Sequence, residues 1–188
     1  MAPKTTAPQR REAAIPQVAV AVVDLLNSRP YANLGDKLDD PRTAAAVLRP
    51  FGAHPVEGSG AADRLEAARA IRSDLLALVA AADPADRAHH WAALSGRIAA
   101  VTFRQEFTGP GRVDLRQTDG DPVVGGIVQA VAALVAADNW TRIRLCANEE
   151  CHEAFYDTSR SRTRRWHSYE VCGNRTNVAA YRVRHQQS

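Results

Sequence analysis

The sequence predicts a mainly α-helical protein with a small β-hairpin: a helical N-terminal domain followed by a small C-terminal α+β module. Three observations predict this class. Apolar residues recur at helical spacing over most of the first 140 residues. Asp-Pro pairs, which are typical of helix starts, stand at three places. All three cysteines and most of the unbalanced positive charge lie beyond residue 140 of the 188-residue chain.

The first part of the chain predicts an arm, a helix and a shorter helix. Residues 1–14 are polar, contain two prolines and show no periodicity, so we expect a disordered arm. The apolar run from Ile15 to Asn27 fits either a buried helix or a strand, and we favour a helix. Asp40-Pro41 is typical of a cap that opens a short helix ending near Arg49. The Pro- and Gly-rich residues 50–60 predict a loop.

Three longer helices follow, each with an apolar stripe. The first runs from Leu65 to Ala82, and the others begin after Asp83-Pro84 and Asp121-Pro122. Gly125-Gly126 should weaken the first turns of the last of these helices. A β-hairpin is predicted between the second and third helices; its turn is Gly109-Pro110-Gly111, and its arms carry Phe103, Phe107, Val113 and Leu115. The predicted division is therefore an arm over 1–14, a helical domain over 15–140 and a C-terminal module over 141–188.

Positive charge is concentrated at the C-terminal end of the chain. The formal net charge is only +3, but residues 158–188 contain seven Arg and a single acid, Glu170. Such a segment is typical of a surface that binds a polyanion. The candidate nucleic-acid contacts are its arginines: Arg160, Arg162, Arg164, Arg165, Arg175, Arg182 and Arg184.

The same segment holds two pairs of metal-ligating residues. Cys146 and Cys151 are separated by four residues, as are His167 and Cys172, and fifteen residues lie between the pairs. Two close pairs joined by a loop supply the four ligands of a tetrahedral zinc ion. We therefore predict one structural Zn²⁺, because four protein ligands leave no position for a catalytic water.

Other interpretations of these residues remain open. Buried free cysteines also pack as small hydrophobic side chains without a metal. His152 and His185 are less favoured candidates for the fourth ligand. Thiolate-rich tetrahedral ligation suits iron as well as zinc.

The residues of this segment resemble a known module. Cys146-x₄-Cys151, Phe155 to Arg160, Arg164-Arg165-Trp166 and Cys172-Gly173-Asn174-Arg175 look like the CGNR-type zinc finger. In bacterial proteins that module follows an ABATE-family domain, and Asp24 to Arg29 is similar to an early motif of that family. The resemblance implies a stress-linked transcription regulator whose finger binds DNA. The sequence departs from the family at His167, where a cysteine is usual, and at Asn177, where lysine is frequent.

Individual residues of the finger have competing roles. The arginines either contact DNA or pair with acids of the helical domain, which would make the finger a protein-interaction module. Arg175 either binds phosphate or holds the finger together through a carboxylate such as Asp157. Trp166 is favoured as a core residue over a base-stacking one. Gly173 is expected to let backbone N–H groups point at a thiolate.

The remaining expectations concern partners and location. No phosphate-binding loop, nucleophile elbow or paired-carboxylate signature is present, so we expect no enzyme and no catalytic residue. No apolar run reaches the length of a membrane span, and no secretion signal is recognised, so we expect a cytoplasmic protein. DNA is the main predicted partner. A small-molecule or protein effector of the helical domain and a homodimer are the others considered.

Overall fold

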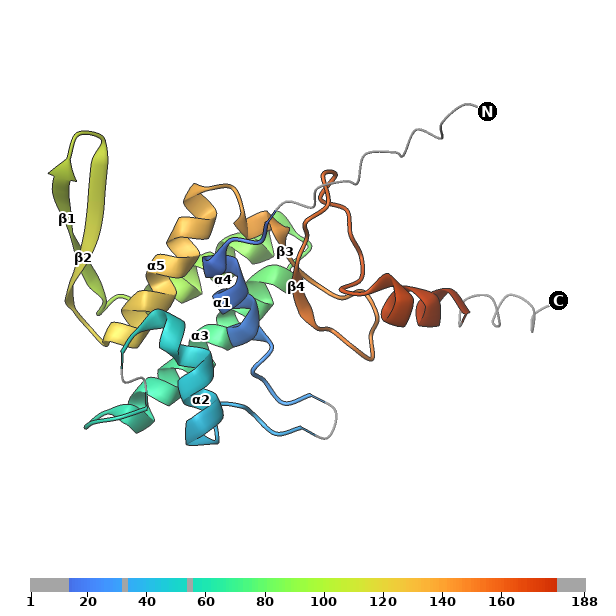
Figure 1. Ribbon diagram of the computed structural model, residues 1–188, viewed down its shortest axis with the longest axis horizontal. Coiled ribbons are helices and arrows are strands. Elements are labelled where there is room, and N and C mark those ends of the chain that lie inside the picture. Colours follow the sequence, from blue (N-terminus) through green and yellow to red (C-terminus); the bar gives the residue numbers. More distant parts are fainter. Residues whose placement is uncertain (1–13, 32–33, 54–55, 179–188) are drawn as a thin grey trace, which may run out of the picture.

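The computed structural model describes residues 14–31, 34–53 and 56–178. Figure 1 shows a helical body with a hairpin projecting from one end and the C-terminal segment packed at the other. The predicted arm and the predicted end of the last helix, with Arg182, Arg184 and His185, lie outside the described residues. The elements are α1 (Gln17–Leu26), α2 (Pro41–Leu48), η1 (Arg49–Phe51), α3 (Ala61–Ala80), α4 (Pro84–Arg97), β1 (Thr102–Gly109), β2 (Arg112–Asp119), α5 (Pro122–Ala136), η2 (Trp140–Arg142), β3 (Ile143–Leu145), β4 (Ala154–Tyr156) and η3 (Tyr169–Gly173).

The predicted fold class is confirmed. The apolar run after Ile15 forms helix α1, and the hairpin has the predicted turn. Asp40, Asp83 and Asp121 cap α2, α4 and α5 by accepting hydrogen bonds from backbone N–H groups of the first turn. The three Asp-Pro signals work because the carboxylate satisfies N–H groups that the helix leaves free, while proline has no N–H to satisfy.

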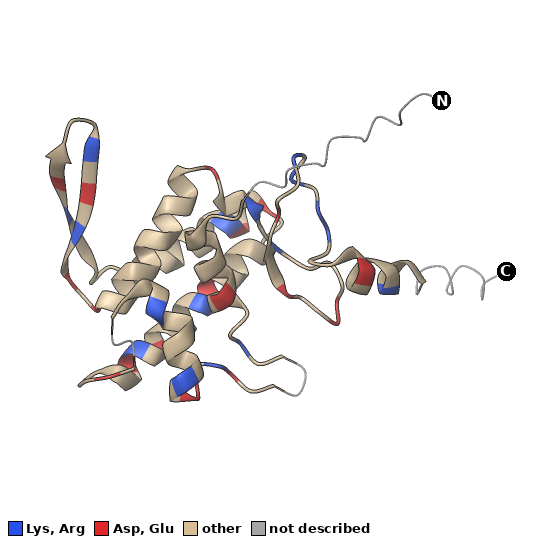
Figure 2. Ribbon diagram, viewed as in Figure 1, with Lys and Arg blue, Asp and Glu red and all other residues tan. Residues whose placement is uncertain are grey.

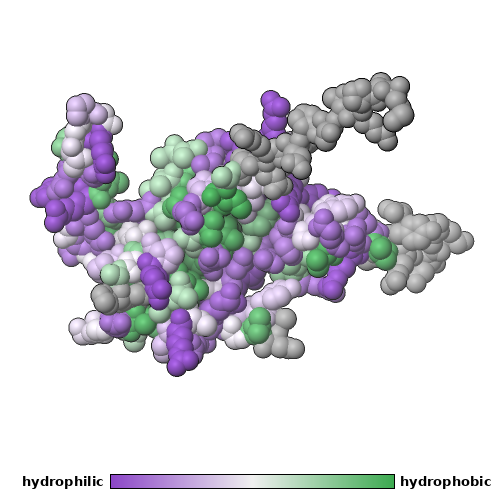
Figure 3. Space-filling model, viewed as in Figure 1, coloured by the Kyte–Doolittle hydropathy of each residue, from purple (hydrophilic) through white to green (hydrophobic). Residues whose placement is uncertain are grey.

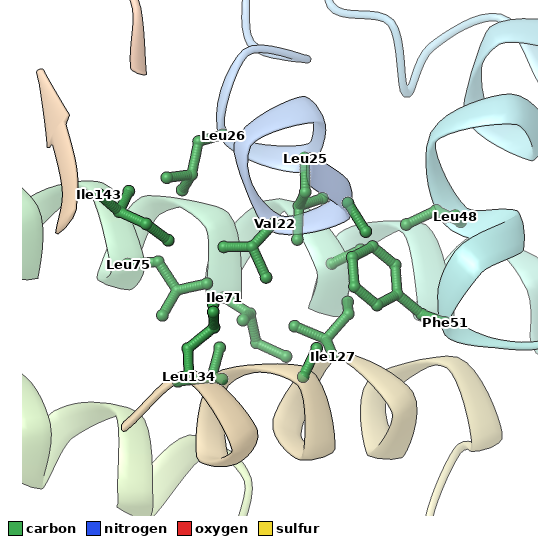
Figure 4. Close-up of a cluster of buried hydrophobic side chains, with 14 of the residues drawn as sticks. Val22, Leu25, Leu26, Leu48, Phe51, Ile71, Leu75, Ile127, Leu134 and Ile143 are labelled. Atoms are coloured by element: carbon green, nitrogen blue, oxygen red, sulfur yellow. The ribbon is translucent and has the colours of Figure 1, made fainter. Parts of the chain in front are cut away.

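A single hydrophobic core joins the helices to the start of the C-terminal segment. Helix α1 contacts α2, α3 and α5, and its fully buried side chains lie at the centre. Figure 4 shows how the other elements surround them. The core residues labelled there are Val22, Leu25, Leu26, Leu48, Phe51, Ile71, Leu75, Ile127, Leu134 and Ile143.

The C-terminal segment begins without a linker. Strands β3 and β4 form a two-stranded antiparallel sheet, and Ile143, Ala154 and Tyr156 of that sheet are part of the main core. Just before β3, the ring of Trp140 packs on that of Trp91 in α4, with 5.4 Å between centroids. The segment after residue 140 therefore shares its apolar side with the helical body.

A buried ion pair fixes the loop between α1 and α2. The Arg72 guanidinium on α3 binds both carboxylate oxygens of Asp36 and also donates to Ser28 Oγ at 2.7 Å. Burial alone would raise the pKa of Asp36, but the hydrogen bonds from Arg72 and the Leu38 N–H lower it. The carboxylate therefore stays ionised, and the loop is held against α3.

None of the helices in the described ranges has both the length and the apolar character needed to cross a membrane.

The two glycines of α5 permit close approach of other parts of the chain, which explains why glycine stands at these helical positions. A Cβ at Gly126 would lie 1.7 Å from the Phe51 carbonyl oxygen, and one at Gly125 would overlap the Gln117 side chain. Because backbone atoms cannot yield as a flexible side chain can, Gly126 sets the distance between η1 and α5.

We expect Gly126→Ala to destabilise the protein by about 1–3 kcal/mol, because overpacking outweighs the gain of about 1 kcal/mol in helix propensity. Gly96→Ala is the control, since a Cβ at Gly96 in α4 meets nothing within 4 Å. That variant should gain up to about 1 kcal/mol. Urea unfolding followed by circular dichroism measures both, and equal stabilisation by the two variants would contradict the steric explanation.

Candidate metal centre

Four side chains from separate turns of the C-terminal segment converge on one point. They are Cys146, Cys151, His167 and Cys172, and their candidate ligand atoms all lie within 4.8 Å of one another. The three cysteines are buried and free, and His167 is half-buried. These are the four residues whose spacing predicts a metal site, whereas His152 is exposed and is not part of the cluster.

The first ligand pair lies on the connection between β3 and β4. Cys146 follows β3 directly, and its N–H donates to the Glu153 carbonyl at 2.8 Å. The chain then turns so that the N–H groups of Cys151 and His152 both donate to the Asn148 carbonyl. His152 has a φ of 49°, in the left-handed region, which completes the turn into β4. This tight turn brings Cys151 beside Cys146.

The second pair brackets the start of η3. Ser168 caps this turn, and its carbonyl accepts the N–H groups of Cys172 and Gly173. The Gly173 N–H thus bonds to an oxygen, and the expectation that backbone N–H groups of this turn point at a thiolate stays a prediction. Glycine is needed here because a Cβ would lie 2.7 Å from the ring of Tyr169.

The donor set and its spacing suit zinc. His167 Nδ1 lies 3.4 Å from Cys151 Sγ and 3.8 Å from Cys172 Sγ. Ligands at the usual Zn–S and Zn–N bond lengths stand roughly 3.5–3.8 Å apart on a tetrahedron. Three thiolates and one imidazole, all from the protein, leave no open position. The prediction of one structural zinc ion is confirmed.

Glu153 orients the histidine, a role that the sequence analysis did not assign. Its Oε2 lies 3.3 Å from His167 Nε2, on the side of the ring away from the cysteines. A histidine that ligates through Nδ1 donates its other N–H to such a group, which fixes the tautomer. The signal in the sequence was weak, since Glu153 is one of several acids around Cys151.

One candidate ligand, Cys151, holds its proton more tightly than an ordinary cysteine. Burial is the main reason why the pKa of Cys151 is raised to about 11, and the neighbouring thiols of Cys172 and Cys146 raise it further. A hydrogen bond from the backbone of Glu153 lowers this pKa but does not offset the rise. A dication reverses this effect, because it stabilises the thiolates that burial disfavours. Loading the site therefore releases protons, and acid favours the metal-free form.

Trp166 lies over the centre. It is half-buried and packs against the three cysteines, and its ring meets that of Tyr169 edge-on at 5.9 Å. Its indole nitrogen is buried. The interpretation of Trp166 as a core residue agrees with this placement.

The comparison with protein families agrees with the geometry. Residues 142–185 match the CGNR zinc finger family. The C-terminal segment of this chain is thus a CGNR zinc finger with a Cys₃His cluster. No curated protein matches the chain. The matched residues begin in η2, so the resemblance of the helical region to the ABATE family stays a prediction, as does the division into domains.

A buried carboxylate organises the loop of the zinc finger that carries most of its arginines. Asp157 is fully buried at the end of β4, and its carboxylate accepts the N–H groups of Ser159 and Arg164 at 2.8 and 2.9 Å. Arg144 lies 3.9 Å from it. Burial alone would raise the pKa of Asp157, but hydrogen bonds from Ser159 and Arg164 lower it. Arg175, for which the sequence suggested a contact with Asp157, is exposed and is not among these contacts.

The predicted nucleic-acid contacts fall into two groups within the described residues. Arg164 donates to the Trp166 and His167 carbonyls, and Arg162 binds Asp138 Oδ2 at 2.7 Å and Thr141 Oγ1. Both are thereby tied to the protein. Arg160, Arg165 and Arg175 are exposed and have no carboxylate partner in the described ranges, although Arg165 covers the ring of Trp166 at 5.1 Å.

The helical body holds the zinc finger through the end of α1. The Asn27 side chain donates to the Ala154 carbonyl at 2.9 Å and accepts its N–H at 2.8 Å. Arg29 donates to the His152 carbonyl, and Tyr31 to that of Glu150. Asn27 also terminates α1, so it serves both as a C-cap and as an anchor. Together with Lys37, Cys151 and Glu153, these side chains line a cavity of about 180 Å³ beside the metal centre.

Glu153→Gln tests the orienting contact. We expect zinc affinity to fall about 10- to 100-fold, because loss of a carboxylate that holds a ligating histidine has that effect. Competition with a chelating dye at pH 7 measures the affinity. Glu150→Gln, which removes a nearby exposed acid in the same turn, is the control and should bind zinc like the wild type. Equal affinities of the two variants would contradict this role.

Asn27→Ala tests the anchor. It leaves the buried N–H and C=O of Ala154 without their partners, so we expect a loss of about 1–3 kcal/mol in stability and faster zinc release to a chelator. Asp24→Ala, an exposed change on the same helix, should do neither. Stopped-flow zinc release and urea unfolding give the two readouts, and wild-type kinetics for Asn27→Ala would show that the zinc finger does not need this contact.

Proposed function

We propose that this protein binds DNA through its CGNR zinc finger and acts as a transcription regulator, with the helical region serving in sensing or association. Zinc has a structural part in this proposal: it closes the turns that carry the arginines. A segment with so few large apolar side chains has no core of its own to do so.

The exposed arginines carry the proposal. Arg160 and Arg165 precede the second ligand pair and Arg175 follows it, and none of the three is neutralised by a carboxylate in the described part of the chain. Figure 2 shows Lys and Arg positions, coloured blue, along the loop between β4 and η3. Unpaired guanidinium groups on a folded surface attract phosphates and bind them in a bidentate manner.

Arg162 and Arg164 support this surface from within. Their hydrogen bonds to Asp138 and to two backbone carbonyls fix the loop that presents Arg160 and Arg165. Replacing them would weaken DNA binding by distorting the loop, whereas replacing the exposed three would remove phosphate contacts directly.

A second candidate is a protein-interaction module without DNA binding. The ion pair between Arg162 and Asp138 favours it, because here an arginine of the zinc finger already meets an acid of the same chain. The hydrogen bonds from Asn27, Arg29 and Tyr31 also support this candidate, because through them the zinc finger packs on a protein surface within its own chain. We further propose that the protein is not an enzyme, since a zinc ion with four protein ligands has no site for substrate.

Fluorescence anisotropy with labelled duplex DNA over a salt series tests the function. We expect the zinc-loaded protein to bind with a steep dependence on salt, and the chelated protein to lose binding. Arg160→Ala, Arg165→Ala and Arg175→Ala together should weaken binding and reduce the slope of log K against log salt by up to about 2.7, because each lost phosphate contact contributes about 0.9.

The matched control removes the same charge elsewhere. Arg42, Arg49 and Arg87 are exposed on α2, η1 and α4, and their replacement by alanine should leave the slope unchanged. An equal reduction by both triple variants would mean that only net charge matters. Absence of binding at low salt would reject DNA as the partner and favour the protein-interaction module.

A further inference from the structure

The loop between α1 and α2 has paired backbone on its two described sides. The Lys37 N–H donates to the Ser28 carbonyl at 2.8 Å, and Tyr31 and Leu34 exchange two backbone hydrogen bonds at 3.1 and 2.9 Å. The buried ion pair described above holds the same loop against α3. A loop that is paired in this way presents its side chains in defined positions, as a binding site requires.

This loop and the first turn of the zinc finger share a cavity. Its volume is about 180 Å³, and its lining includes Arg29 and Lys37 from the loop and Cys151 and Glu153 from the zinc finger. Figure 1 shows the loop extending from the body on the side where the zinc finger packs. Because drug-sized ligands occupy about 300–1,000 Å³, this cavity suits a smaller molecule.

The charge in the lining favours an anionic ligand. Arg29 donates to the His152 carbonyl, which engages only part of a guanidinium with five N–H groups. Within the described ranges, neither Arg29 nor Lys37 forms an ion pair with a carboxylate, and the Lys37 ammonium has no hydrogen bond. The one acid in the lining, Glu153, lies against His167. The two positive charges are therefore available to a ligand.

The rest of the lining favours an organic anion over an inorganic one. Tyr31 and Leu34 add apolar surface to the cavity, and Leu34 is 69% exposed. Figure 3 shows hydrophobic surface at the outer end of this loop. Covering such a side chain with an apolar group is favourable, and a guanidinium binds a carboxylate through two parallel hydrogen bonds.

We propose that this cavity binds a small organic carboxylate, whose charged group pairs with Arg29 and Lys37 and whose apolar part packs on Leu34. The proposal rests on the sensing role proposed above for the helical region, because it names the class of ligand that would be sensed. It does not depend on DNA, since none of the exposed arginines of the zinc finger lines the cavity.

The position of the cavity couples the ligand to the zinc finger. One wall belongs to the loop after α1, and the other contains a zinc ligand, Cys151, and the residue that orients His167. A molecule bound between them stabilises their packing, and it binds more tightly to the zinc-loaded form. By linkage, the ligand must then also favour retention of zinc.

Titration of the zinc-loaded full chain with benzoate tests the site. We expect benzoate to shift the amide NMR signals of residues 28–37 and 151–153. Benzamide, which has the same shape without the charge, should bind at least about 10-fold more weakly, because it lacks the charged hydrogen bonds. Inorganic phosphate should also bind more weakly than benzoate, because it has no apolar part. Calorimetry measures the affinities.

Three variants separate the contacts. Lys37→Met should weaken benzoate binding about 3- to 10-fold, because it removes one exposed charge and keeps the length of the side chain. Leu34→Ala should weaken benzoate binding by a similar factor but leave acetate binding unchanged. Arg42→Met is the control, since Arg42 is an exposed cation of α2 that does not line the cavity. Circular dichroism and zinc content confirm that each variant is folded.

Stopped-flow transfer of zinc to a chelator tests the coupling. Saturating benzoate should slow zinc release at least about 5-fold, and benzamide at the same concentration should not. An unchanged rate with benzoate bound would overturn the coupling.

The site itself has its own contrary results. Absence of shifts with benzoate, equal affinities for benzoate and benzamide, phosphate binding as tight as that of benzoate, or an equal loss in Arg42→Met would overturn it. Failure of DNA binding with benzoate binding intact would reject only the DNA partner. Salt-dependent DNA binding without benzoate binding would reject only this site.

Discussion

The paired hydrogen bonds between the Asn27 side chain and the backbone of Ala154 join the metal centre to the helical body. They hold strand β4 at the end of α1, and β4 leads directly into the buried Asp157, on which the arginine loop depends. Behind Asn27, the ion pair of Arg72 with Asp36 fixes the loop that supplies Arg29 and Tyr31. The chain of contacts therefore runs from the core of the body to the surface of the zinc finger.

Both the metal and the helical body stabilise the folded zinc finger, each on a different side. On its apolar side, Ile143, Ala154 and Tyr156 enter the main core, so half of the small sheet is stabilised without metal. On its other side, three buried thiols and His167 have only Trp166 and one another to pack on. Without a cation, buried thiolates at this distance would be unfavourable because they are desolvated and repel one another. Zinc binding supplies the free energy that stabilises the folded cluster.

The arginines illustrate how one residue type serves two purposes. Those that point inward, such as Arg144 and Arg164, bind carbonyls and the Asp157 carboxylate, and they give the loop its shape. Those that point outward keep their charge available. Guanidinium suits both tasks, because it offers several donors in a plane and remains charged in either setting.

Local patterns determined much of this protein. The Asp-Pro caps, the helical stripes, the Gly-Pro-Gly turn and the paired ligand spacing each act over a few residues, so the sequence by itself determined the helices, the hairpin and the Cys₃His set. Only the tertiary structure decided which side chains meet over long separations. Asn27 and Ala154, Arg162 and Asp138, and Gly126 and the Phe51 carbonyl are far apart in the chain, and no local pattern marks them. The Arg-rich segment shows this division most clearly. Its composition indicated a basic surface, but within the described residues burial and pairing left Arg160, Arg165 and Arg175 exposed, because contacts made in three dimensions determine which charges remain free.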